Sequence, residues 1–310
     1  MTPRRVHIDT DPGLDDLLAL ALAFASPELS VEGVTTVAGN AALPIVTDNA
    51  RRFCALAASD VPIGIGASAP LALTPIDAAH FHGKDGRRGA PLPEVAAADL
   101  APARDVLRHS LVSRRVESVI ALGPLTNVAT LASENPKLFA DAEVVWMGGT
   151  LAAGNVTAKA EYNAFADPRA LRILLASGVR VRIVGLEVTT RVHFRGEEVA
   201  AFELGDSRRA RLLGAVLRGL CDAERALGGV GRAVLHDPCA VAAALAPELF
   251  AFAPRALEVC DREGAERGRI RARGAAPQGA AQYAVDVRAA DVGGLFLERI
   301  SRWARAEAAA

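Results

Sequence analysis

The sequence predicts an α/β fold: a single domain built on a mostly parallel, open sheet of the Rossmann-like type, with helices on both faces. Short β-branched runs alternate along the chain with longer Ala- and Leu-rich runs at helical spacing. Parallel strands joined by crossover helices produce this alternation. In addition, 51% of the 310 residues are hydrophobic, which is enough to bury a large core.

The elements are expected where the residue patterns change along the chain. The predicted strands span residues 6–9, 31–37, 118–122, 143–147 and 179–185. The predicted helices span residues 15–26, 44–58, 103–115, 124–131, 167–176 and 207–227. Apolar and charged residues alternate around two glycines within residues 257–287, which indicates an antiparallel hairpin near the end.

No internal repeat and no Pro/Ser-rich linker divides the sequence, so residues 1–310 are expected to form one domain. Residues 70–93 are rich in Gly, Pro and His and lack periodicity. They predict a long surface loop of the kind that often carries function. The Ala-rich tail, residues 305–310, is expected to fray.

The charge balance and the cysteines limit the class of partner. The 35 basic and 36 acidic residues nearly cancel, so nothing in the overall charge attracts nucleic acid or an acidic membrane. The four cysteines are far apart without a Cys-x-x-Cys pair, which suits a reducing cytoplasm. No signal peptide is recognisable, and the richest apolar stretch, residues 17–25, falls short of the ~20 residues that span a bilayer. A cytoplasmic protein with a small-molecule ligand is expected.

Four aspartates lie within eight residues, directly after the first predicted strand and at the start of an apolar helix. They are Asp9, Asp11, Asp15 and Asp16, with no Lys or Arg among them. A helix dipole stabilises each nearby carboxylate by only ~0.3–1 kcal/mol, which is too little to offset the repulsion among four neighbouring carboxylates. A bound cation would offset it. Ligands that are all oxygen suit Ca²⁺ or Mg²⁺. The alternative is an N-capped helix with a solvated acidic turn, which four acids at this spacing disfavour.

Further polar residues follow other predicted strands. Asn40 follows the second strand, residues 122–127 the third, and residues 147–149 the fourth. Each segment alone is typical of a turn or a helix cap. Ligands of open parallel sheets bind beyond the carboxyl ends of the strands, so the convergence of these segments on one edge favours a binding site.

Two later segments complete the candidate site. Polar side chains in residues 154–163 precede a helix near Asp167 and could hydrogen-bond a ribose. Asp237 precedes an apolar run and could close a metal site at the start of another helix. In the alternative interpretation, Asp237 is only an N-cap and His236 only a loop residue.

These segments together resemble the inosine-uridine preferring nucleoside hydrolase family, from about residue 6 to about residue 300. The resemblance rests on residues 9–16, 39–40, 123–127, 147–149, 161–163 and 236–237. It implies the nucleoside hydrolase fold and an enzyme that cleaves the N-glycosidic bond of purine and pyrimidine ribonucleosides, releasing ribose and free base in salvage or catabolism. It also implies a homo-oligomer, either a tetramer or a dimer.

The resemblance also implies roles for individual residues. Ca²⁺ would be held by Asp11, Asp16, Asp237 and the main-chain carbonyl of Leu122, and Asp11 would be the general base for a metal-bound water. Asp9 would support the site from behind. The residues that would bind the ribose are Asp15, Asn40, Asn155, Glu161 and Asn163, with Met147 packed under the sugar.

Departure of the base leaves positive charge on the sugar. The base is a poor leaving group unless it is protonated or hydrogen-bonded as it departs. Histidine titrates near neutrality and suits this task. His236 is the first candidate and His82 the second, although His80 and His82 would otherwise read as exposed loop residues. Family members often place aromatic or other long side chains before His236, whereas residues 222–235 hold no Tyr or Trp. Weak stacking from that side predicts broad or pyrimidine-leaning use of nucleosides.

Two other functions fit part of the pattern. Phosphatases that form an aspartyl-phosphate also carry Asp-x-Asp after a first strand and bind Mg²⁺. Here Asp11 is followed by Pro12-Gly13, and the Asp15-Asp16 pair has no role in that chemistry. A nucleoside-binding protein without catalytic activity would keep the same pocket, although the presence of Asp11 favours an enzyme.

Overall fold

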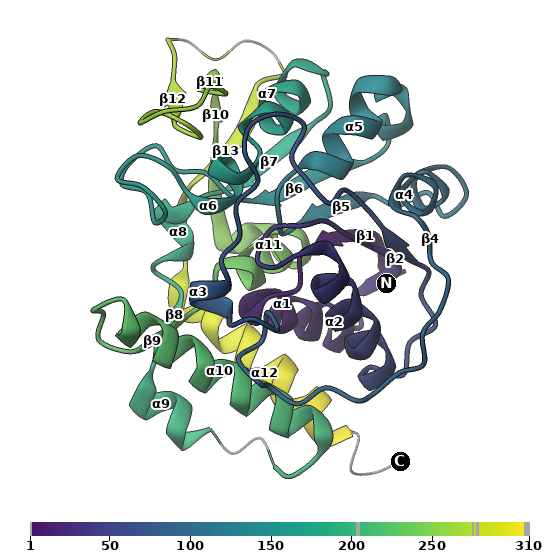
Figure 1. The fold of residues 1–310 in the computed structure, drawn as a ribbon, viewed down its shortest axis with the longest axis vertical. Coiled ribbons are helices and arrows are strands. Elements are labelled where there is room, and N and C mark those ends of the chain that lie inside the picture. Colours follow the sequence, from purple (N-terminus) through teal and green to yellow (C-terminus); the bar gives the residue numbers. More distant parts are fainter. Residues whose placement is uncertain (1, 203–204, 275, 277–278, 307–310) are drawn as a thin grey trace.

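A computed structural model describes residues 2–202, 205–274, 276 and 279–306 and shows the predicted α/β architecture. Within these residues a nine-stranded sheet runs in the order β10-β13-β7-β6-β5-β1-β2-β3-β4 (Figure 1). The strands are β1 (Arg4–Thr10), β2 (Leu29–Thr36), β3 (Ile63–Ile65), β4 (Ala101–Pro102), β5 (Ser118–Ala121), β6 (Glu143–Met147), β7 (Val181–Val184), β10 (Phe250–Arg255) and β13 (Ala281–Val287). Neighbouring strands are parallel except for the antiparallel pair β10 and β13.

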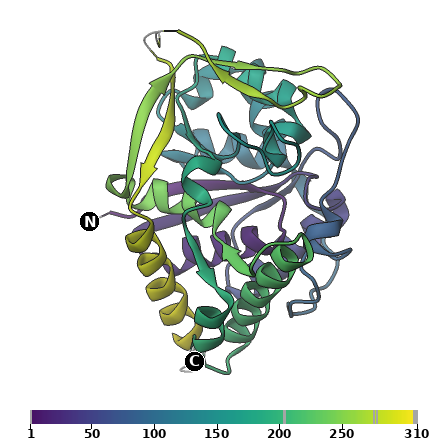
Figure 2. The same cartoon turned by 90° about the vertical axis from the view of Figure 1, so that its left-hand side faces the viewer.

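Two short antiparallel pairs lie outside this sheet. They are β8 (His193–Arg195) with β9 (Arg232–Val234), and β11 (Leu257–Val259) with β12 (Ile270–Ala272). Figure 2 shows the β10–β13 pair at the edge of the molecule, with the last helix following β13. The α-helices are α1 (Leu14–Ala25), α2 (Leu43–Leu56), α3 (Ala79–His82), α4 (Ala103–Val112), α5 (Thr126–Glu134), α6 (Tyr162–Ala166), α7 (Pro168–Ala176), α8 (Leu186–Thr189), α9 (Gly196–Ala201), α10 (Arg208–Ala226), α11 (His236–Leu245) and α12 (Ala289–Ala306).

Helices cover both faces of the sheet. Helices α4, α5 and α7 lie on one face and α1, α2 and α11 on the other, with α10 and α12 outside α1 (Figures 1 and 2). A hydrophobic core lies on each face of the sheet. Strand β5 contributes to both cores, because successive side chains of a strand point to opposite faces. Val119 and Ala121 join the core under α4, α5 and α7, whereas Ile120 and the following Leu122 join the core around α1 and α11.

Helix α1 packs against the sheet on one side, and helices α10, α11 and α12 surround the rest of it. Its residues 14–23 are all buried, as expected for a helix that is apolar around its whole circumference. The first turn of α1 is therefore buried as well, and Asp15 and Asp16 lie within it. The fold places two carboxylates inside the protein by burying the helix that begins with them.

The paired strands bring the candidate segments to one edge. Asp9 of β1 is opposite Thr35 of β2 and Ala121 of β5, and Ala121 is in turn opposite Trp146 of β6. The carboxyl ends of these four strands therefore lie side by side. The loops that follow them meet at this edge, where open parallel sheets bind ligands.

The predicted strands and helices up to residue 227 form, with shifted ends. The strand at residues 143–147 has its predicted bounds, whereas the helix expected over residues 103–115 ends at Val112. The hairpin expected within residues 257–287 is only partly correct. Strands β11 and β12 form a hairpin, but β13 pairs with β10 and extends the main sheet through β7.

Residues 70–93 contain one short helix, α3, between β3 and β4. At the other end, α12 continues to Ala306 although the tail is expected to fray from residue 305. Trp303 anchors this end, because its ring stacks on Phe53 and lies under the guanidinium of Arg209. Residues 307–310 lie outside the described residues. Among the described helices, none is both long enough and apolar enough to cross a membrane.

The burial of α1 predicts a large loss of stability when its side chains are shortened. Leu20 is fully buried, so Leu20→Ala should lower the free energy of unfolding by about 2–5 kcal/mol. Leu71→Ala is the matched control, because Leu71 is 41% exposed, and its effect should stay within about 0.5 kcal/mol. Urea denaturation of both variants measures the difference. Equal effects of the two substitutions would contradict the assignment of α1 to the core.

Candidate active site

A cavity of about 360 Å³ opens at the carboxyl edge of the sheet, between the loops after the central strands and the helices α10 and α11. Every site residue predicted from the sequence lines it except Asp9, Asp11 and Asp16. The predicted residues on its wall are Asp15, Asn40, His82, Leu122, Met147, Asn155, Glu161, Asn163, His236 and Asp237. The pocket therefore brings together segments from both ends of the chain.

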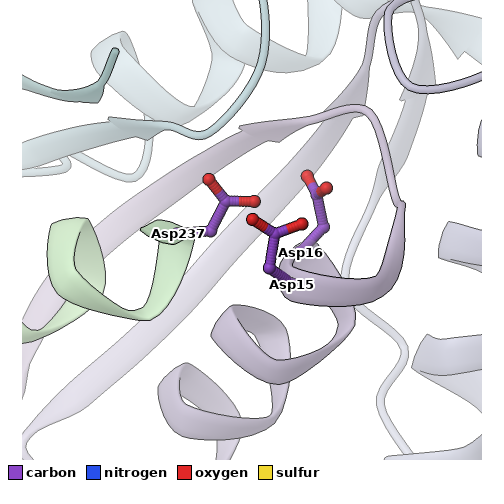
Figure 3. Close-up of side chains that lie close together, drawn as sticks. All are labelled: Asp15, Asp16 and Asp237. Atoms are coloured by element: carbon purple, nitrogen blue, oxygen red, sulfur yellow. The ribbon is translucent and has the colours of Figure 1, made fainter. Parts of the chain in front are cut away.

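Three buried carboxylates meet at the pocket floor. Asp15 and Asp16 come from the first turn of α1 and Asp237 from the first turn of α11, and Figure 3 shows their side chains pointing toward one another. One ligand oxygen of each lies within 4.8 Å of the others, a spacing that could hold a metal ion. Residues more than 200 positions apart in the sequence thus form one acidic cluster.

Asp16 is held by four donors. Its Oδ1 accepts hydrogen bonds from the Thr10 hydroxyl (2.5 Å) and the Asp11 amide (3.2 Å). Its Oδ2 accepts from the Gly13 amide (3.0 Å) and from Nδ2 of Asn40 (2.8 Å). These donors fix the direction of the carboxylate and make Asn40 part of its support.

Asp11 lies beside this cluster, between the loops that follow β2 and β5. Its Oδ2 accepts a hydrogen bond from the Asn40 amide at 2.7 Å, and its buried Oδ1 has no partner among the described residues. A Cβ at Gly39 would come within 2.1 Å of Oδ2, and one at Gly123 within 2.3 Å of Oδ1. Both glycines are therefore required for this close approach of the two loops to the carboxylate.

The acids at this edge act on one another. Burial raises the pKa of Asp11 well above its usual range, and the charge of Asp16 adds to the effect. Burial and the Asp16 charge likewise raise the pKa of Asp15. The pKa of Asp237 is raised by burial and then by the charges of Asp15, Asp16 and Asp11. Buried carboxylates that repel one another are stabilised either by a bound cation or by protonation.

The donor set fits a hard divalent ion. The three clustered carboxylates supply oxygen ligands, the unpartnered Oδ1 of Asp11 lies close by, and the Leu122 carbonyl belongs to the same pocket. Oxygen ligands of this kind suit Ca²⁺ or Mg²⁺. The structure adds two facts that the sequence did not suggest. Asp15, rather than Asp11, completes the tightest carboxylate group, and the Leu122 carbonyl accepts a hydrogen bond from Nδ2 of Asn163 (2.7 Å).

Glu161 and Asn163 shape the wall next to the acids. Glu161 caps the start of α6, accepting from the amides of Asn163 (2.8 Å), Ala164 (3.0 Å) and Gly149 (2.7 Å). Burial nevertheless raises the pKa of Glu161. Asn163 also donates to the carbonyl of Met147 at 3.1 Å. Glu161 and Asn163 are therefore locked in place by main-chain contacts.

Asn155 and Asp9 complete the predicted set. Oδ1 of Asn155 accepts from the Tyr162 amide at 3.0 Å, on the wall of the pocket. Asp9 lies behind the site, and its Oδ1 accepts from the Thr35 hydroxyl (2.5 Å) and from Nδ2 of Asn127 (2.8 Å). Burial raises the pKa of Asp9 to about 6. These contacts tie β1 to its neighbours directly beneath the acidic cluster.

Both candidate histidines are neutral over the physiological pH range. The interpretation of His82 as an exposed loop residue is wrong, since only 6% of it is exposed and its Nδ1 accepts a hydrogen bond from the Leu14 amide at 3.0 Å. Burial and the nearby Arg88 lower the pKa of His82 to about 3. Burial lowers the pKa of His236 to about 4, and its Nδ1 lies 2.8 Å from the Thr189 hydroxyl. In His82 the remaining proton is therefore on Nε2.

Several pocket residues were missed at the sequence level. Phe81 and Tyr162 supply aromatic surface; the Phe81 ring meets His82 edge-on at 4.9 Å, and the Tyr162 hydroxyl donates to the Gly39 carbonyl at 2.6 Å. Both could have been found from the sequence, because Phe81 is adjacent to His82 and Tyr162 lies between Glu161 and Asn163. Further missed residues include Leu220 and Glu224 of α10, Leu227 directly after that helix, and Arg232 and Val234 of β9.

Comparison with known proteins gives a consistent result. A family model described as inosine-uridine preferring nucleoside hydrolase matches residues 6–295. A pyrimidine-specific ribonucleoside hydrolase, RihA, of Photobacterium profundum is 38% identical over 254 residues, covering 80% of this chain and 82% of that protein. RihA of Salmonella enteritidis is 36% identical over 256 residues, covering 81% of this chain and 82% of that protein.

Solved structures show the same similarity along nearly the whole chain. A purine-preferring ribonucleoside hydrolase from Gardnerella vaginalis superposes with a TM-score of 0.90 at 29% identity, covering 98% of this chain and 100% of that one. A plant nucleoside hydrolase, the PpNRh1 enzyme, gives a TM-score of 0.87 at 30% identity, covering 96% of this chain and 99% of that one.

The acidic cluster predicts how stability responds to metal. In protein freed of metal with EDTA, added CaCl₂ should raise the melting temperature, since an ion at 100 times its Kd adds about 2.7 kcal/mol. Asp237→Asn should lose this response. Its melting temperature in EDTA should equal or exceed that of the parent, because one of the mutually repelling carboxylates is gone.

Thermal unfolding followed by circular dichroism measures both effects. Asp286→Asn is the matched control, because Asp286 pairs with Arg191 at the surface, and it should keep the full CaCl₂ response. An Asp237→Asn variant that keeps this response would contradict the metal site.

Proposed function

The chain belongs to the inosine-uridine preferring nucleoside hydrolase family, and from this premise we propose how its residues bind and cleave a ribonucleoside. As a member it is an N-ribosyl hydrolase. The observation that carries the proposal is the meeting of Asp15, Asp16 and Asp237 at a pocket that is lined by Asp15, Asp237 and two of the predicted histidines, His82 and His236. The phosphatase and the non-catalytic alternatives lose their basis, because the family model covers nearly the whole chain.

The metal proposed for this site is Ca²⁺, held by Asp11, Asp16, Asp237 and the Leu122 carbonyl. When bound, the ion would acidify a water molecule and bind ribose hydroxyls. The support is the oxygen-only donor set and the free Oδ1 of Asp11. Because Asp15 lies within the same carboxylate group, it contributes to the charge that attracts the ion and remains close enough to contact the sugar.

Asp11 is proposed as the general base. Its Oδ2 is fixed by the Asn40 amide, whereas its Oδ1 is free to accept a proton from the attacking water. As water attacks C1′ of the ribose, the bond between C1′ and the base breaks and its electron pair passes to the base. In the transition state the sugar carries positive charge, which the carboxylates of Asp15 and Glu161 would stabilise.

The ribose is proposed to lie against the locked wall of the pocket. Its hydroxyls would be bound by Asp15, Asn40, Asn155, Glu161 and Asn163, with Met147 packed under the ring. The support is that all six residues line the pocket and that main-chain hydrogen bonds hold Asn155, Glu161 and Asn163. A rigid wall positions the sugar without a further loss of side-chain freedom.

His236 is proposed to assist departure of the base, with His82 as the second candidate. Each uses Nδ1 within the protein, toward Thr189 and Leu14 respectively, so each has only Nε2 to offer to the base. With pKa values lowered by burial, both are neutral near pH 7. Their contribution is a hydrogen bond to the leaving base rather than a fully charged acid.

Broad use of ribonucleosides with a preference for pyrimidines is proposed. Residues 222–235 contribute no Tyr or Trp, and the aromatic surface in the pocket comes instead from Phe81 and Tyr162. The relatives named pyrimidine-specific ribonucleoside hydrolase RihA support the preference. We further propose a homotetramer or dimer in the cytoplasm that serves nucleoside salvage or catabolism, a setting that suits four free cysteines.

The direct test measures free ribose from uridine, cytidine, inosine and adenosine, with and without a chelator. Release should require the divalent ion, and kcat/KM should be higher for the pyrimidine nucleosides. Asp11→Ala should lower kcat at least 100-fold, the scale of a lost general base. The control Asp60→Ala changes an exposed aspartate and should leave the rate unchanged. A near-parental rate for Asp11→Ala refutes the base assignment, and strict purine selectivity refutes the preference.

The contributions of His236 and His82 to departure of the base can be compared by using a second substrate whose leaving group departs without protonation. His236→Ala should lower kcat for uridine by about 10²- to 10⁴-fold, and His82→Ala by a smaller factor. Both should hydrolyse 4-nitrophenyl β-ribofuranoside at nearly the parental rate, because nitrophenolate leaves unaided. His193→Ala is the control, since that imidazole is hydrogen-bonded to the Thr190 carbonyl near the surface. Equal losses on both substrates would exclude leaving-group assistance.

A further inference from the structure

Strand β9 and the last turns of α10 form part of the pocket wall. Arg232 and Val234 line the pocket, whereas Ala233 between them is buried on the other side. This is the alternation expected of a strand. The same chain continues directly into His236 and Asp237. Arg232 is therefore the pocket residue of this segment farthest along the chain from the metal-binding acids.

Glu224 of α10 fixes Arg232 from behind. Its Oε1 accepts from Nε of Arg232 at 3.0 Å, and its Oε2 accepts from the Arg232 amide at 3.0 Å and from the Gly231 amide. The Glu224 side chain is only 17% exposed. Both carboxylate oxygens of Glu224 are thus occupied: Oε2 holds the main chain at Gly231 and Arg232, and Oε1 holds the Nε edge of the Arg232 guanidinium.

The other edge of the guanidinium is free. Nη1 and Nη2 of Arg232 make no hydrogen bond within the described part of the chain, and the side chain is 40% exposed. By contrast, Arg225 uses Nη1 to pair with Asp222 outside the pocket, where both side chains are more than half exposed. Arg232 therefore brings to the pocket wall a guanidinium that is held at Nε and has two further donors, Nη1 and Nη2, without a partner among the described residues.

We infer that Arg232 recognises the distal edge of the nucleobase, donating from Nη1 and Nη2 to a carbonyl oxygen such as O4 of a uracil or O6 of a hypoxanthine. The inference rests on the proposed function, because it requires the ribose to sit at the acidic end of the pocket. An arginine fork held by a carboxylate is well suited to such an acceptor. Glu224 is a positioning residue in this arrangement.

The same contact favours cleavage. When the bond between C1′ and the base breaks, its electron pair passes to the base nitrogen and is shared through the ring with the carbonyl oxygen. The attacking water leaves its hydroxyl on C1′, and its other proton ends on the base, so the reaction consumes one water. Donors fixed at the carbonyl oxygen stabilise the charge that develops there. Cytosine and adenine present an amino group at that edge, so they offer Arg232 no acceptor there.

Arg232→Gln tests the inference in the full-length enzyme with its metal. Its kcat/KM should fall about ten- to one hundred-fold for uridine and inosine, the range for a lost charge-assisted hydrogen bond. For cytidine, adenosine and 4-nitrophenyl β-ribofuranoside it should stay within about two-fold. Arg232→Lys keeps the charge but loses the fork and should fall between parent and Arg232→Gln. Glu224→Gln should show the same selective loss in weaker form.

Arg225→Gln is the matched control. Its guanidinium lies near Gly231 but outside the pocket lining, so the variant reports any general disturbance of this turn and should retain the parental selectivity. Unchanged kcat/KM for uridine in Arg232→Gln would overturn the inference, as would an equal loss on all five substrates or the same selective loss in Arg225→Gln. A parent enzyme that releases neither ribose nor nitrophenolate would instead reject the proposed function itself.

Discussion

The repulsion among buried carboxylates is the constraint on which the rest of this structure depends. Asp11, Asp15, Asp16 and Asp237 are buried beside one another, and burial together with the charges of neighbouring carboxylates raises the pKa values of Asp11, Asp15 and Asp237. Such a group persists in a folded protein only if something at the same place favours negative charge. Here the amides at the start of α1 contribute to that, and the oxygen donors leave room for a cation.

The architecture around the acids is organised to hold them without filling the space between them. Burying α1 on all sides fixes the position of its first turn, and the packing of α11 against α1 brings Asp237 opposite it. The glycines at 39 and 123 let two loops pass close to Asp11 where any side chain would displace it. Asn40 bonds both Asp11 and Asp16, so one residue sets the relative positions of two acids.

The sequence predicted most of this edge because strands, helices and strand-end loops are specified by local patterns. Asp11, Asn40 and Glu161 could be placed because each follows a recognisable strand or precedes a helix. What could not be predicted depends on contacts between distant segments. The burial of His82 follows from its bond to the Leu14 amide, 68 residues away, and nothing in its own loop indicates it. The pairing of β13 with β10, and the contribution of α10 to the pocket, likewise require the folded structure.

The bond between His82 and the Leu14 amide joins two parts of the enzyme that the sequence keeps apart. Leu14 is the first residue of α1, where a helix leaves its amides without internal partners. The imidazole satisfies one of them, so the loop containing α3 completes the very turn that carries Asp15 and Asp16. Withdrawal of that loop from the pocket mouth would strip the helix of this partner. The position of that loop and the conformation of the turn that carries Asp15 and Asp16 are consequently thermodynamically coupled.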